Sequence, residues 1–269
     1  MLVLAALLWG IAYSIQSYSS SVLGPYTIGF LKMSCGIPLL IFCIINKRKF
    51  NKTAIFGGIA LGFIVLLGTF FQQLGIERTS VSKSSFLSVL YIVLVPLFEL
   101  LFGKKPKNSI WLAILLAIIG IYLLCMSEEF SINIGDIFVF IGSIFWALQI
   151  LVIDRASDNA DGLVLAGISQ STSCIISFVL MLINEPGSFV GLGNNMIFPI
   201  LYTIFLSGFL AETIQSKFQR NVQPSLASLL LSLESVFGAL GGWVILNQTL
   251  SIKEIIGCVL IFIAIIIAE

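Results

Sequence analysis

Long apolar runs separated by short polar segments make up nearly the whole 269-residue chain. Runs such as "LIFCIINKRKF" and "CVLIFIAIIIA" do not alternate between apolar and polar residues, so they predict helices rather than the strands of a membrane barrel. A membrane-spanning helix needs about 20 mostly apolar residues. By this criterion the pattern predicts ten spans: Leu2–Tyr18, Pro25–Ile45, Ala54–Gly75, Ser84–Phe102, Ser109–Met126, Ile134–Ile153, Gly162–Ile183, Ile197–Lys217, Pro224–Leu246 and Ile252–Ala268.

The composition supports a chain that lies in lipid. Hydrophobic residues make up 58% of it and charged residues only 10%, whereas soluble domains carry about 25% charged residues. So little charge cannot cover a surface in water, so we expect an all-α integral membrane protein whose main partner is the lipid bilayer. The formal net charge of +1 gives no electrostatic basis for binding nucleic acid.

The positions of Lys and Arg predict the orientation of the spans. If the N-terminus is cytoplasmic, only Arg78, Lys83 and Lys253 of the fourteen Lys and Arg residues fall in outer loops. Lys32 falls inside a span, and the others fall in inner loops. Short cytoplasmic loops carry an excess of basic residues, so both termini are expected in the cytoplasm, with the protein in a bacterial-type plasma membrane. An odd number of spans would remove this asymmetry, which supports the count of ten.

Several classes of chemistry lack their usual residues. The chain has no histidine, and its five cysteines are widely spaced and form no CxxC pair. We therefore expect neither a metal site nor a cofactor. The HExxH and GxSxG signatures of two enzyme classes are missing, and so is the GxxxxGK[ST] loop that binds nucleotide phosphates. The sequence argues against an enzyme and against transport driven directly by ATP.

An internal repeat relates the two halves of the chain. Ser85–Pro106, "SFLSVLYIVLVPLFELLFGKKP", aligns with Ser228–Thr249, "SLLLSLESVFGALGGWVILNQT", at an offset of 143 residues. Trp9 and Trp146 match in a second, shorter pair of segments. With five helices in each half, the second half enters the membrane from the opposite side. The sequence thus predicts two inverted five-helix repeats, 1–127 and 134–269, an architecture typical of secondary transporters.

Four stretches carry a resemblance to a known family. They are "ALLWGIAYS", "GIERTSVSKSSFLSVLYIVLVP", "NVQPSLASLLLSLESVFGALGG" and "LSIKEIIGCVLIFIAIII". Together they resemble the EamA family of the drug/metabolite transporter superfamily, whose members have two five-helix EamA units. The resemblance implies a membrane transporter and places a glutamate at position 234 in many members. Ser235 stands where the family commonly has proline, so the resemblance does not carry the gating of the family over to this chain.

Glu234 and Lys32 are the ionisable candidates among the residues of the predicted spans. Glu234 is about ten residues from either end of its span, where an unpaired ionised carboxyl costs at least a few kcal/mol. It is either a functional cavity residue or a structural carboxyl that bonds a neighbouring helix. Lys32 lies about one third of the way into its span. It could receive a solute carboxylate or phosphate, pair with Glu234, or extend its amine toward the membrane surface.

Aromatic and amide side chains complete the candidate set. At the repeat offset Tyr91 occupies the position of Glu234, so both are expected beside a central cavity. The remaining candidates could line the same cavity or serve ordinary helix packing. They are Trp9, Tyr13, Trp146, Gln72, Gln215 and Gln170, of which Gln215 matches Gln72 and Gln170 matches Lys32.

These features predict a secondary transporter. It would move a small metabolite, with an amino acid or a related compound as one candidate, by alternating access at a site near the midplane. Glu234 is a candidate carrier of a coupling proton. The alternative class is a non-transporting membrane receptor or structural protein, although the sequence has no soluble domain or large loop for such a role. Solute flux separates the two classes.

Overall fold

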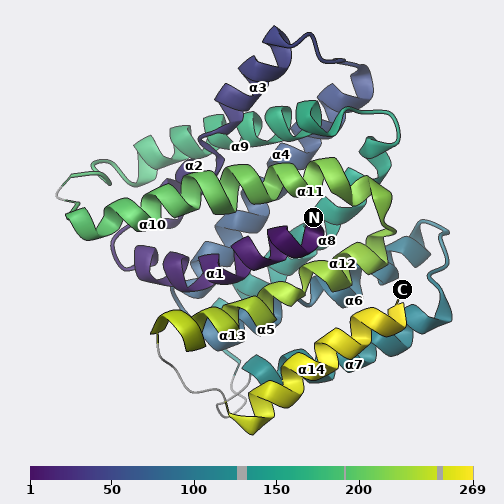
Figure 1. Ribbon diagram of the computed structural model, residues 1–269. Helices are drawn as coiled ribbons and strands as arrows, with labels where there is room; N and C mark the ends of the chain where they lie inside the picture. Colours follow the sequence, from purple (N-terminus) through teal and green to yellow (C-terminus); the bar gives the residue numbers. More distant parts are fainter. Residues whose placement is uncertain (126–131, 191, 247–250, 269) are drawn as a thin grey trace.

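The computed structural model describes residues 1–125, 132–190, 192–246 and 251–268, and all the regular structure within these ranges is helical (Figure 1). Eight segments are long and apolar enough to cross a membrane, and Pro224–Leu240 is a shorter apolar segment. With the 17-residue helix α14 (Ile252–Ala268) they account for the ten predicted spans. The boundary residue 127 of the first predicted repeat and residue 269 of the second lie outside the described residues.

Five spans besides α14 are unbroken helices. They are α1 (Leu2–Ser20), α4 (Lys52–Ile76), α7 (Asn108–Cys125), α8 (Ile134–Ser157) and α9 (Gly162–Asn184). Four spans that the sequence predicted as single helices are interrupted. Span 2 consists of α2 (Pro25–Met33) and α3 (Gly36–Ile45), span 4 of α5 (Val81–Ser88) and α6 (Tyr91–Leu101), and span 9 of α12 (Pro224–Leu231) and α13 (Leu233–Leu246).

Span 8 is the most irregular segment. It begins with a short 3₁₀ turn, η1 (Asn194–Met196), and α10 (Ile197–Leu201), and it continues as the π-helix η2 (Tyr202–Ala211). It then returns to α-helix as α11 (Glu212–Phe218) and ends in the 3₁₀ turn η3 (Gln219–Asn221). A π-helix usually appears as a single turn and often at functional sites. The ten-residue π segment therefore makes span 8 a candidate for a functional role.

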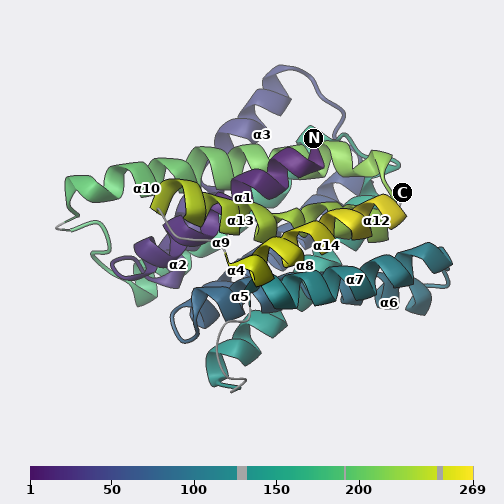
Figure 2. The ribbon, with the colours of Figure 1, turned by 60° about the horizontal axis from the view of Figure 1, so that its bottom comes forward.

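The helices run roughly side by side, with both termini at the same end of the bundle (Figures 1 and 2). We call this end the terminal face and the opposite end the distal face. Helices α7 and α14 pack together along one edge, and span 2 packs against α9 on the other side. Between them α4 packs on α8, while α1 packs on η2 and α13. The contact of α4 (span 3) with α8 (span 6) thus has a counterpart in the contact of η2 (span 8) with α1 (span 1).

The interruption in span 2 has a local cause, and those in spans 4 and 9 correspond to each other in the repeat. In span 2 the break at Ser34 and Cys35 precedes Pro38, whose ring would clash with the carbonyl of Ser34 one turn earlier and whose nitrogen has no proton to donate. In spans 4 and 9 the breaks fall at Val89–Leu90 and at Ser232, nearly the same point once the 143-residue offset is applied. Interruptions at corresponding points of two inverted halves indicate where such proteins build their binding site.

Candidate functional site

Each matched break places one polar side chain at the start of the next helical segment. Tyr91 begins α6, and Glu234 is the second residue of α13. Both side chains are buried, and the Tyr91 hydroxyl donates a hydrogen bond of 3.1 Å to Oε1 of Glu234. Close approach of α1 brings the segment inward, because a Cβ on Gly10 would overlap the backbone of Glu234 and Gly238. The two positions that the repeat relates are therefore in direct contact.

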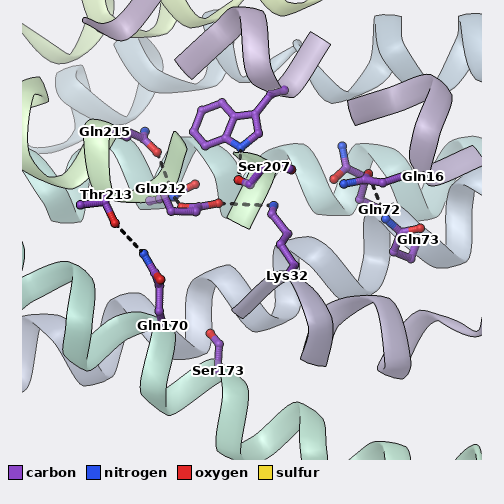
Figure 3. Close-up of polar contacts among 12 residues, drawn as sticks. Gln16, Lys32, Gln72, Gln73, Gln170, Ser173, Ser207, Glu212, Thr213 and Gln215 are labelled. Carbon is purple, nitrogen blue, oxygen red and sulfur yellow. Dashed lines mark hydrogen bonds and ion pairs between the residues drawn. The ribbon is translucent and has the colours of Figure 1, made fainter. Parts of the chain in front are cut away.

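A second buried acid forms an ion pair with Lys32. The Lys32 amine lies 3.3 Å from Oε1 of Glu212, and each side chain is only about 5% exposed. Figure 3 shows the two side chains pointing toward each other between spans 2 and 8. Gln149 donates a 2.8 Å hydrogen bond to the other oxygen of Glu212, and the ring of Trp146 lies 5.0 Å from the Lys32 amine. Lys32 thus pairs with Glu212 and not, as one alternative from the sequence had it, with Glu234.

The π-helix accounts for this pairing. Gly208 lies within η2, and a Cβ there would overlap the backbone carbonyl oxygen of Lys32, so only glycine permits this approach of spans 2 and 8. Trp9 donates its indole proton to the Ser207 carbonyl at 3.0 Å, which fixes α1 against the same segment. Glu212 begins the α-helix that directly follows. The orientation of its side chain toward Lys32 therefore depends on the preceding π-helical turns.

A central cavity lies between these groups. Its free volume of about 50 Å³ leaves room for a few water molecules. Spans 1, 2, 3, 4, 6, 8 and 9 all contribute to its lining. The lining residues are Trp9, Ala12, Tyr13, Gln16, Lys32, Gln72, Tyr91, Trp146, Gln149, Ile150, Glu212, Gln215, Leu231 and Glu234.

On the distal side the cavity is bounded by amides from span 3. Gln72 donates hydrogen bonds of 3.0 Å to the hydroxyls of Tyr13 and Ser88. Its neighbour Gln73 donates to Gln16 at 3.1 Å, as Figure 3 shows. These contacts hold spans 1, 3 and 4 together, and each buried amide has a partner, as buried polar groups require.

On the terminal side the second half supplies a similar set of amides, of which Gln215 matches Gln72 in the repeat. Gln149 donates to Gln215 at 3.0 Å, and Gln215 donates to Gln219 at 2.9 Å. Gln219 in turn donates to the carbonyl of Ile150 at 2.7 Å. The two amide clusters, one from each half, therefore lie on opposite sides of the cavity.

Eight of the nine residues proposed from the sequence line the cavity, and Gln170 does not. Its amide donates to Thr213 at 3.2 Å, beside the ion pair (Figure 3). The candidate set from the sequence did not include Glu212, which helix packing could also explain, or Gln149 and Gln16. Glu212 carried a usable signal, because it is an acid within an apolar span. The two glutamines carried none, because their roles depend on how the helices are rotated.

The cavity holds no arrangement suited to a metal. Among the described residues there is no group of three or more His, Cys, Asp or Glu side chains that could hold an ion. The two acids of the cavity already have a lysine and a tyrosine as partners. The chemistry that the site offers is reversible binding of charged and amphipathic groups, together with one carboxyl that has a neutral partner.

Spans 2 and 7 are joined at both ends by contacts outside the cavity. At the distal face the Glu185 carboxylate accepts the backbone N–H groups of Tyr26 and Thr27, at 3.0 and 2.8 Å. At the terminal face Arg48 lies 2.9 Å from Asp161. Partial burial acts to raise the pKa of Asp161, but the bonds from Arg48 and from the Leu163 amide outweigh it and hold that pKa below its usual value.

Known proteins resemble this chain along its whole length. The model of the EamA-like transporter family matches residues 1–126 and 133–268. An "uncharacterized transporter" of Archaeoglobus fulgidus is 26% identical over 273 residues, which cover 100% of this chain and 84% of that protein. Another, from Methanothermobacter thermautotrophicus, is 24% identical and matches 94% of this chain and 80% of its own length. One solved crystal structure shares the fold, with a TM-score of 0.81 at 16% identity, over 99% of this chain and 94% of that one.

Proposed function

This chain belongs to the EamA-like transporter family and is a membrane transporter, and on that premise we propose that it is a secondary transporter of a small zwitterionic metabolite. An amino acid or a related compound has the required chemistry. The observation that carries the proposal is the buried Lys32–Glu212 pair in the wall of the central cavity. Ionisable groups at this depth are expensive to bury, and they commonly mark the path of a solute.

The ion pair suits a solute that carries both charges. A carboxylate of the solute takes the place of Glu212 beside Lys32, and an ammonium group takes the place of Lys32 beside Glu212. Each buried charge keeps a partner when the solute enters. An unpaired buried charge would cost about 3–5 kcal/mol. The rings of Trp9 and Trp146 face the apolar part of the solute. A singly charged solute leaves one of the two protein charges unpaired.

The small cavity fits an occluded state of an alternating-access cycle. A free volume of about 50 Å³ cannot hold an amino acid, so the solute enters only when one side opens. The two inverted repeats, 1–127 and 134–269, rock against each other about the cavity. The amides around Gln72 separate on opening toward the distal face, and those around Gln215 separate on opening toward the terminal face.

Proton coupling is assigned to Glu234. Its partner is the neutral hydroxyl of Tyr91, so its charge is not balanced in the way that Lys32 balances Glu212. An ionised carboxyl in such a place is costly, and protonation removes the cost. Glu234 therefore gains and loses a proton as the cavity opens to either side. The terminal face carries most of the basic loop residues, so on this proposal it faces the cytoplasm, and the protein lies in a bacterial-type plasma membrane.

The proposal is tested by binding and flux. Purified protein is screened by thermal shift against matched solutes, L-leucine with its 2-hydroxy acid and its amine analogue, and against a wider metabolite panel. Solutes that raise the melting temperature are then assayed for uptake into proteoliposomes, with Lys32→Gln/Glu212→Gln as the variant that lacks both charges. We expect zwitterions to bind and to move, and the variant to lose the preference. Binding without flux would instead indicate a receptor, and flux restricted to singly charged solutes would overturn the zwitterion assignment.

A further inference from the structure

A second pocket opens on the terminal face. It lies between the end of span 4, the end of α8 and the start of α12, and its free volume is about 380 Å³, against about 50 Å³ for the central cavity. Its lining includes Glu99, Lys105, Asp154, Arg220 and Ser225. Nothing in the function described so far uses this pocket.

The pocket shares its walls with the central cavity. Helix α8 contributes Ile150 to the cavity and Asp154, one turn later, to the pocket. Span 8 contributes Gln215 to the cavity and Arg220 to the pocket. Helix α12 begins at the pocket and ends at the cavity. The pocket therefore lies directly between the cavity and the terminal face.

Gln219 separates the two spaces. Its side chain is about 1% exposed, it donates to the Ile150 carbonyl at 2.7 Å, and it accepts from Gln215 at 2.9 Å. Gln215 lines the cavity, and Arg220, the residue after Gln219, lines the pocket. Two side-chain hydrogen bonds thus fix the amide that closes the path between them.

The charges of the pocket favour an anion. Asp154 is paired, because it lies 2.8 Å from the Lys104 amine, and Glu99 accepts from the neutral Ser225 hydroxyl. Lys105 and Arg220 are therefore two cations against one carboxyl that has no cationic partner among the described residues. The side chains of Lys105 and Arg220 are exposed, and neither forms an ion pair within the part of the chain that the structure describes. Two cations without acidic partners face one pocket, and a guanidinium binds a carboxylate through two parallel hydrogen bonds.

We infer that this pocket is a second solute site, in which Lys105 and Arg220 hold the carboxylate of the solute. The solute occupies this site before it enters the central cavity or after it leaves it. It passes between the two through the space that Gln219 closes. The inference rests on the proposed function, since it places the pocket on a transport path. A lipid phosphate carries similar charge, but the walls come from helices that surround the central cavity, so the structure favours a solute from water.

Reactivity of an introduced cysteine measures the anion preference. Asn221→Cys is placed at the pocket in a variant whose five native cysteines are replaced, and its rates with anionic sulfonatoethyl and cationic trimethylammonioethyl methanethiosulfonate are compared. With each rate divided by the rate of the same reagent with a small free thiol, we expect the anionic reagent to react about threefold to tenfold faster. Lys105→Gln with Arg220→Gln should bring the ratio close to one. A ratio that these two changes leave unaltered would overturn the assignment.

A matched cysteine separates a site from a merely basic surface. Lys49→Cys lies in another basic loop of the terminal face. Millimolar L-leucine or its 2-hydroxy acid, each of which carries a carboxylate, should slow modification at 221 and not at 49. Equal protection at both positions, or none, counts against a built site. Slowing at 221 by phosphatidylglycerol vesicles, with no effect of either carboxylate, would assign the pocket to lipid and overturn the solute site.

A transport measurement in the native-cysteine protein tests the path. For the solute identified by flux, Arg220→Gln should raise KM about threefold or more with little change in maximal rate, and Lys49→Gln should change neither. An unchanged KM would overturn a role on the path. If no solute shows flux while the anion preference at position 221 is intact, the proposed function is contradicted but the anion site is not. The failure of the proposed function can therefore be told apart from the failure of this inference.

Discussion

The cavity contains two buried carboxyls in different settings. Glu212 lies 3.3 Å from the Lys32 amine and accepts a further bond from Gln149, whereas Glu234 accepts one bond from the Tyr91 hydroxyl. The first carboxyl is held as half of an ion pair. The second has only a neutral partner, so its charge state can change without leaving an unpaired cation. On the proposed function, this difference assigns the binding of solute charge to Glu212 and proton transfer to Glu234.

The internal repeat makes the contrast sharper. At the 143-residue offset, Glu212 corresponds to Thr69 and Glu234 to Tyr91. Lys32 is matched to Gln170 with a gap in the alignment, at a spacing of 138 residues. Both acids therefore come from the second half, and the first half has neutral groups in their places. Thr69 Oγ1 and Gln170 Oε1 have no hydrogen-bond partner among the described residues. Thr69 and Gln170, which match Glu212 and Lys32, are thus neutral, and each has one polar atom without a hydrogen-bond partner among the described residues. The two halves therefore differ in charge at this site.

The largest expected effect comes from Glu234→Gln. The amide has a similar shape and cannot carry a proton, so uptake driven by a pH gradient should be abolished while solute exchange without a gradient continues. The measurement is flux into proteoliposomes with and without an imposed gradient. Glu212→Gln should impair both reactions, because it removes a solute contact. Gradient-driven uptake that survives in Glu234→Gln would contradict the division of roles.

Next in size is the loss of stability when one member of the ion pair is removed. Glu212→Gln leaves Lys32 buried without its counter-charge, and we expect a loss of about 3–5 kcal/mol. Lys32→Gln combined with Glu212→Gln leaves no charge unpaired and should lose less than Glu212→Gln alone. Chemical denaturation in detergent measures both. A double variant as unstable as the sum of the single variants would show that the two groups are not coupled.

Tyr91→Phe should have a smaller effect. It removes the hydroxyl that donates to Glu234, and we expect a loss of about 1 kcal/mol in the free energy of unfolding, together with slower coupled uptake. Tyr202→Phe is the matched control, because its hydroxyl donates to the Leu8 carbonyl at 2.8 Å outside the residues that line the cavity. If both variants slow uptake to the same extent, the Tyr91 hydroxyl has no special role at the acid.

The smallest effect is expected at the terminal face, in Arg48→Gln. Because the pKa of Asp161 is lowered in the folded protein, its contribution to stability is present above the unfolded pKa and is lost as pH falls through the folded pKa. The melting temperature of Arg48→Gln should therefore lie slightly below that of the parent at pH 7, and the two should converge as the pH falls through the lowered pKa of Asp161. A difference that persists at low pH would show that the contact with Asp161 is not its cause.

Much of this arrangement follows from the sequence because it depends on composition and spacing. The ten spans follow from apolar length, and the expectation that Tyr91 and Glu234 both lie beside the cavity follows from a repeat that relates two positions near an axis. The partner of Lys32 could not be predicted in this way. It depends on the rotation of span 8, and an apolar run such as "YTIFLSGFLA" does not show that it forms a π-helix. The breaks before Tyr91 and Glu234 were likewise not predicted, because neither is placed by a proline at the point of interruption.

The π-helix in span 8 also has a mechanical consequence. A π turn holds more residues than an α turn, so conversion of part of η2 to α-helix shifts every later side chain around the helix axis. A shift of one residue turns the following helix by about 100°. Glu212 lies directly after η2, so such a shift swings its carboxylate off the Lys32 amine without unfolding the span. Gly208, packed on the Lys32 backbone, lies where this rotation is resisted. A change of register within η2 would therefore separate Glu212 from Lys32 through rotation of α11 alone.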